Sequence, residues 1–89
     1  MVSQDILIIN RLGLHARAAA QLVRMANEYP CDIRLAMDGQ DSDAKSVMEV
    51  LMLGATNGTK LKLSADGDKE GEALKSIADL FAARFNELE

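Results

Sequence analysis

The sequence has very little of several residue types on which particular protein classes depend. Its 89 residues include one cysteine, one proline, one histidine and no tryptophan, and only 3% of them are aromatic. The lone Cys31 excludes an internal disulfide framework and a cysteine-based zinc site. Because the net charge is −4 and aromatic side chains are scarce, we expect no nucleic-acid binding.

Long apolar segments are also missing. No unbroken apolar run exceeds four residues, as at positions 6–9 and 50–53, so neither a membrane span nor a signal-peptide core is expected. Apolar residues still make up 48% of the chain, which is enough for one core. We therefore expect a small soluble cytoplasmic protein with one domain over residues 1–89 and neither a cofactor nor a metal ion.

The hydrophobic pattern predicts the element order βαββαβα. Strands are expected where β-branched or alternating apolar residues occur, and helices where apolar residues recur every three or four positions. The predicted strands are 5–10, 31–38, 40–43 and 59–65, and the predicted helices are 16 to about 28, 46–53 and 70 to about 88. Strands with one apolar face need one covering layer. The sequence thus predicts an α+β two-layer open sandwich, with a four-stranded antiparallel sheet covered on one face by three helices.

Several residues mark the ends and faces of these elements. Pro30 should end the first helix, and Gly54 should stop the second. Ser46 and Glu49 have capping-box spacing, in which each side chain bonds the backbone N–H of the other. The expected buried stripe of the last helix is formed by Leu74, Ile77, Ala78, Phe81, Phe85 and Leu88.

The most informative segment for function is Gly-Leu-His-Ala-Arg at positions 13–17. His15 directly precedes a predicted helix that lacks a Ser, Thr, Asp or Asn cap, so the N–H groups of Ala16, Arg17 and Ala18 have no obvious side-chain acceptor. Such a helix start favours an anion, and Arg17 adds a permanent cation. The neutral imidazole is the nucleophilic form, and positive surroundings favour it. These features suit transient capture of a phosphoryl group on His15, although a surface histidine acting as a weak cap remains the alternative.

This segment resembles the active-site motif of HPr, the histidine-containing phosphocarrier family of the bacterial phosphoenolpyruvate-dependent phosphotransferase system. Lys-Ser-Val-Met at 45–48, followed by Leu-Met-Leu-Gly at 51–54, is similar to the second motif of that family. Element order and length match as well, so the resemblance spans nearly the whole chain.

The resemblance implies a role for particular residues. HPr accepts a phosphoryl group from phosphorylated enzyme I on Nδ1 of a histidine that corresponds to His15, and passes it to enzyme IIA proteins or domains. The matching arginine, Arg17, stabilises the phosphoryl group. The implied partner-docking surface maps onto Ala16, Ala20, Arg24, Val47, Met48 and Leu51, although inward packing of Val47, Met48 and Leu51 is the alternative reading. The protein would then be a monomeric carrier and not an enzyme in the strict sense.

Two positions depart from the usual family pattern. Ala18 stands where the family usually has proline, which restores one backbone donor in the first turn. Glu49 stands where relatives with a regulatory serine often have glycine. Ser46 matches that serine, which HPr kinase/phosphorylase modifies in many Firmicutes, so Ser46 is either a cap alone or a cap and a regulatory phosphorylation site.

Two other functions compete with the carrier role. A regulatory phospho-switch of the same family, in its nitrogen-related branch, would control partner proteins instead of sugar uptake. A small-ligand sensor on a similar sandwich would need a pocket and an oligomer interface, and no residue pattern marks either. Cys31, at the start of a strand, is expected to be a buried, inert thiol.

Overall fold

The computed structural model describes residues 1–86 and confirms the predicted order of strands and helices. The elements are β1 (Val2–Leu7), α1 (Ala16–Ala26), β2 (Asp32–Met37), β3 (Gln40–Asp43), α2 (Val47–Leu53), β4 (Lys60–Asp66), α3 (Glu70–Ala82) and a short 3-10 helix η1 (Arg84–Asn86). No helix within these residues is long and apolar enough to cross a membrane.

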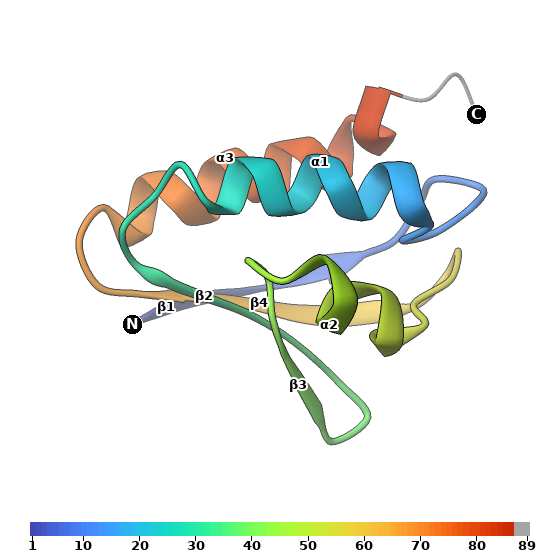
Figure 1. Ribbon diagram of the computed structural model, residues 1–89, viewed down its shortest axis with the longest axis horizontal. Helices are drawn as coiled ribbons and strands as arrows, with labels where there is room; N and C mark the ends of the chain where they lie inside the picture. The colour runs from blue at the N-terminus through green and yellow to red at the C-terminus, as the bar shows by residue number, and fades with distance from the viewer. Residues whose placement is uncertain (87–89) are drawn as a thin grey trace.

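The four strands form one open antiparallel sheet in the order β1-β4-β2-β3. The helices α1 and α3 lie side by side over one face of it, and α2 lies beside α1 and contacts β3 (Figure 1). The short, charged β3 is an edge strand as expected, because its acidic side chains discourage further pairing. The predicted two-layer sandwich is therefore confirmed.

Strand alternation explains where the core lies. In β2 and β4, every second side chain faces the helices, and Ile33, Leu35, Leu61 and Leu63 are fully or almost fully buried. Each such side chain stabilises the fold by roughly 1.5–3 kcal/mol relative to an exposed one. From above, α1 contributes the buried Ala18, Ala19, Leu22 and Ala26. This layer fixes the axis of α1, and therefore the position at which its N-terminus emerges.

The first strand is displaced from its predicted position at 5–10. It runs from Val2 to Leu7, because the whole of this segment pairs with β4, from Val2 opposite Ala65 to Leu7 opposite Lys60. Ile6 and Ile8 are buried, whereas Leu7 and Ile9 are exposed. The run of four apolar residues is thus covered on one face only.

The first and last helices end earlier than their patterns predict. Asn27 caps α1 at its C-terminus, three residues before Pro30. The last helix, α3, ends at Ala82, and Phe85 then has a left-handed backbone with φ 55°. This turn buries the Phe85 ring against Phe81, edge to face with centroids 4.9 Å apart, so Ile77, Phe81 and Phe85 of the predicted stripe are buried without a continuous helix. The rest of the stripe is wrong in part: Leu74 and Ala78 are only partly buried, whereas Ala73 and Leu80 are buried in their place. Leu88 lies outside the described residues.

The predicted capping box of α2 forms only in part. The Ser46 hydroxyl accepts from the N–H of Glu49 at 3.3 Å, as expected. The Ser46 N–H, however, already donates to the carbonyl of Asp43 in the preceding turn. The Glu49 carboxylate therefore accepts from the N–H of Asp43 at 3.0 Å instead. Gly54 ends the helix in the left-handed conformation, as predicted.

Candidate functional site

His15 is the N-cap residue of α1, as the sequence predicts. Its backbone is extended (φ −74°, ψ 179°), and its side chain makes no capping hydrogen bond. The ring is partly exposed at the surface. Because the ring is partly exposed, an incoming group can reach the imidazole from outside the molecule.

The helix start behind His15 is open to an anion. The first helical hydrogen bond runs from the N–H of Ala19 to the carbonyl of His15 at 2.8 Å, so the N–H groups of Ala16, Arg17 and Ala18 precede the helical ladder. No acidic residue occupies the first turn of α1. The side chain of Arg17 is exposed, which keeps its charge available at the surface. The start of α1 thus has a partly exposed histidine, three backbone N–H groups outside the helical ladder and an exposed arginine at consecutive positions of the chain, which are groups that can favour an anion.

The loop before His15 is held by a close contact between two backbones. Gly13 has φ +65°, and a Cβ atom there would lie 2.6 Å from the carbonyl oxygen of Ala55 and 2.7 Å from Cα of Thr56. The next N–H, from Leu14, donates to that same Ala55 carbonyl at 3.0 Å. Glycine is therefore required for both its conformation and its lack of a side chain. The motif at positions 13–17 does not show this close approach, because Ala55 and Thr56 lie far away in the sequence.

Sequence reasoning missed Asn10. This residue is fully buried, and its Nδ2 donates to the carbonyl of Gly13 at 2.8 Å. Its own carbonyl accepts from the N–H of Gly13 at 3.2 Å and from Nδ2 of Asn57 at 3.1 Å. The available signal was an amide residue placed directly after an apolar run and before a glycine-containing break, which is typical of a loop held by side-chain hydrogen bonds.

The six residues mapped as a docking surface all have exposed side chains: Ala16, Ala20, Arg24, Val47, Met48 and Leu51. They belong to two helices, α1 and α2, which contact each other. Met48 is 71% exposed, whereas Val50 of the same helix is fully buried. The inward face of α2 is therefore formed by Val50 and Leu53. Two further exposed apolar side chains, Leu12 and Met52, were not singled out by the sequence.

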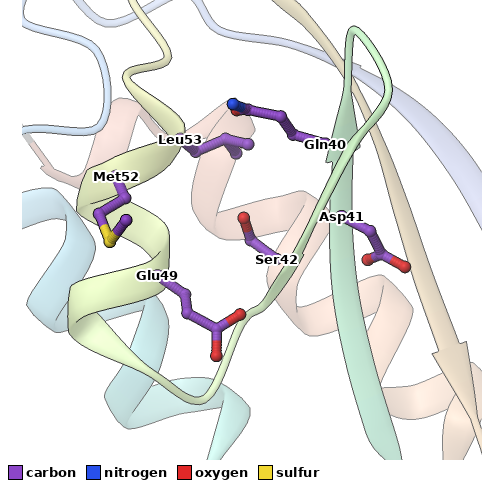
Figure 2. A pocket seen from close by; sticks show the side chains of 6 residues that line it. All are labelled: Gln40, Asp41, Ser42, Glu49, Met52 and Leu53. Carbon is purple, nitrogen blue, oxygen red and sulfur yellow. The ribbon is translucent and has the colours of Figure 1, made fainter.

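An open hollow of about 350 Å³ lies between α2 and β3. Figure 2 shows its lining, formed by Gln40, Asp41, Ser42, Glu49, Met52 and Leu53. His15 and Arg17 do not line it. The hollow thus does not contain the groups that would carry phosphoryl chemistry, and it adds no support for the small-ligand sensor.

Comparisons with known proteins show similarity over nearly the whole chain. Residues 2–83 match the model of the family described as PTS HPr component phosphorylation site. A phosphocarrier protein HPr of Pseudomonas aeruginosa is 47% identical, covering 98% of both chains. The crystal structure of an HPr from Thermoanaerobacter tengcongensis superposes with a TM-score of 0.97 over 100% of both chains, at 40% identity. A phosphocarrier protein NPr of Klebsiella oxytoca is 38% identical, covering 97% of both chains.

The open sandwich and the similarity over the full chain define a phosphocarrier of the phosphotransferase system. The chain belongs to the PTS HPr family.

Proposed function

We propose that His15 accepts a phosphoryl group from phosphorylated enzyme I and passes it to an enzyme IIA protein or domain. One observation carries this proposal. The imidazole of His15 lies at a helix start without capping it, the N–H groups of Ala16–Ala18 precede the helical hydrogen bonds, and the first turn has no acidic residue. A carrier of this kind has no substrate pocket of its own and is a protein substrate for its partners.

The transfer step follows from the chemistry of the groups at the site. The lone pair on Nδ1 of neutral His15 attacks phosphorus, while the bond from phosphorus to the donor breaks and its electron pair stays on the donor. Nε2 of the ring keeps its hydrogen. The phosphoryl oxygens carry the negative charge and lie where the N–H groups of Ala16–Ala18 and the Arg17 guanidinium can stabilise them. Passage to enzyme IIA repeats the step in the opposite sense.

The partners would approach over the exposed residues of α1 and α2. Val47, Met48 and Leu51 supply an apolar surface, and Arg24 supplies a cation beside it. Methionine adapts its shape to different surfaces, which suits a carrier that must bind a donor and an acceptor in turn. The proposed docking surface would thus lie next to His15, so that a bound partner is close to the phosphoryl group that the protein carries.

Because His15 is the only histidine of the sequence, any phosphohistidine in the protein must be at His15. Incubation with phosphoenolpyruvate and enzyme I should add one phosphate that is lost in acid, and His15→Ala should acquire none. Circular dichroism of His15→Ala should show an intact fold, since the ring is partly exposed and makes no capping bond. Acid-labile labelling of a folded His15→Ala variant would refute the assignment.

The nitrogen-related branch is a second candidate because the NPr of Klebsiella oxytoca is also similar over nearly the full chain. The two branches are distinguished by their partners. Rates of phosphorylation by the sugar-branch and the nitrogen-branch enzyme I of one host, followed by transfer to each enzyme IIA, assign the protein to the branch that transfers faster.

Ser46 keeps two proposed roles. As a cap, it accepts from the N–H of Glu49, and loss of such a cap costs about 1 kcal/mol. As a regulatory site, it would be modified by HPr kinase/phosphorylase, with the nearby Glu49 carboxylate opposing the added charge. Intact mass after incubation with the kinase separates the roles: a gain of one phosphate that is absent from Ser46→Ala supports regulation, and no gain in the wild type removes it.

A further inference from the structure

The peptide unit between Gly13 and Leu14 is held at both of its polar groups. Its carbonyl accepts from Nδ2 of Asn10 at 2.8 Å, and its N–H donates to the carbonyl of Ala55 at 3.0 Å. One peptide group therefore connects the end of the first strand segment to the turn that follows α2. It also lies one residue before His15, so its orientation sets the direction in which the chain enters the N-cap.

The side chain that donates to this peptide group is that of Asn10. It is fully buried, and its own backbone carbonyl is bound by the N–H of Gly13 and by Nδ2 of Asn57. Burial and the two hydrogen bonds to the main-chain carbonyl thus fix the backbone from which the Asn10 side chain extends, and Nδ2 in turn binds the Gly13 carbonyl. Buried polar groups in such networks specify one arrangement over others.

We propose that Asn10 is a positioning residue for phosphoryl transfer, acting on His15 through the Gly13–Leu14 peptide. The inference rests on the proposed function, in which His15 is the acceptor. Removal of the Nδ2 donor leaves the Gly13 carbonyl without this partner and lets the peptide rotate. The imidazole then loses its fixed alignment with the N–H groups of the first turn of α1. Since in-line transfer depends on alignment of the reacting atoms, the rate should fall although no group at the reacting centre has been removed.

The test compares Asn10→Ala with a matched control, Asn27→Ala. The Asn27 amide also donates to backbone carbonyls, to Val23 at 2.9 Å and Lys45 at 3.4 Å, but it lies at the opposite end of α1. The rate constant for phosphorylation of His15 is measured in single turnovers at saturating phosphorylated enzyme I, where the rate constant reports on folded molecules. We expect Asn10→Ala to be about tenfold slower or more, and Asn27→Ala to match the wild type.

Two further measurements separate positioning from a general loss of stability. Hydrolysis of the isolated phosphorylated protein should be faster in Asn10→Ala than in Asn27→Ala, because the phosphoryl group is less well held by the first turn of α1. Should Asn10→Ala fail to fold, Asn10→Ser serves as the second variant, since its hydroxyl is too short to reproduce the Nδ2 contact but leaves a smaller cavity. It is also expected to slow transfer.

The outcomes are distinct. Equal rate constants for a folded Asn10 variant and Asn27→Ala, with a normally phosphorylated wild type, overturn the positioning role and leave the proposed function intact. Absence of acid-labile phosphate on wild-type His15 overturns the proposed function itself. Unfolding of both Asn10 variants would show Asn10 to be a residue required for the fold, which also overturns the proposal of a specific positioning role.

Discussion

The close approach of Gly13 to the Ala55–Thr56 backbone can be measured by adding one methyl group. Gly13→Ala places Cβ 2.6 Å from the Ala55 carbonyl oxygen, a distance at which the backbone must move. Gly54→Ala is a matched control. Gly54 has almost the same φ, +68° against +65°, but the nearest atom to its Cβ is 4.0 Å away. The two variants therefore share the conformational penalty and differ in the clash.

The expected magnitudes follow from this comparison. A non-glycine residue in the left-handed region costs roughly 1–2 kcal/mol, and this applies to both variants. The effect of replacing glycine on the unfolded chain is also common to both. Overpacking against a backbone atom adds about 1–3 kcal/mol at Gly13 alone. Since each kcal/mol shifts the Tm of a domain of this size by about 4–8 °C, Gly13→Ala should melt at least about 4 °C below Gly54→Ala.

Thermal unfolding followed by circular dichroism gives both Tm values, and urea unfolding gives the free energies. Amide chemical shifts of Leu14–Ala19 should also change in Gly13→Ala, because the loop is displaced towards the helix start. Equal Tm values for the two variants, within about 1 °C, would show that the two backbones do not approach closely. The loop would then not be fixed in the way that we infer.

Three further predictions concern separate parts of the molecule. Arg17→Ala should slow transfer from enzyme I by about tenfold or more and change the unfolding free energy by less than about 0.5 kcal/mol, because the side chain is exposed; a large loss of stability would make Arg17 structural. Val50→Ala should destabilise the protein by about 2 kcal/mol, whereas Met48→Ala should leave stability unchanged and weaken binding of enzyme I in calorimetry, since only Met48 is exposed. The N–H of Gly67 donates to the Glu70 carboxylate and lowers the pKa of that carboxyl below its ordinary value of 4.5. The hydrogen bond therefore stabilises the folded protein fully above pH 4.5, and this stabilisation is lost as the pH falls through the lowered pKa. Urea unfolding between about pH 6 and 3 should show the difference between wild type and Glu70→Gln shrinking towards the acid end, and a constant difference contradicts this assignment.

The parts of the fold that the sequence could predict are those governed by local periodicity. Ile33 and Leu35 alternate with Asp32 and Arg34, and the strand formed where this alternation placed it. The first strand was displaced because register depends on a partner: Val2 belongs to the sheet since Ala65 pairs with it, and no local pattern shows this. Pairing across more than sixty residues of sequence is beyond what alternation can indicate.

The same division holds at the site. His15 and the open first turn could be predicted because a missing cap is a local feature of the sequence. Asn10 was missed: an amide after an apolar run indicates a loop held by side-chain hydrogen bonds, but it does not show that the peptide it binds is also bound by Ala55, far away in the sequence. The same reason explains why one hydrogen bond of the predicted capping box of α2 does not form. The Ser46 N–H, which the Glu49 carboxylate would have bound, donates to the carbonyl of Asp43 in the preceding turn.

The exposure of the site determines how strongly it could hold a phosphoryl group. The exposed Ala16 and Arg17 would stabilise a phosphoryl group only modestly, because water screens charge at the surface. A buried site would hold the group more strongly and would also block the in-line approach of an acceptor. Under the proposed transfer, His15 must both accept and release, so positioning by a rigid loop is more useful here than strong binding. Gly13 and Asn10, which would hold the loop, are accordingly buried, whereas His15 is partly exposed and Ala16 and Arg17 are exposed.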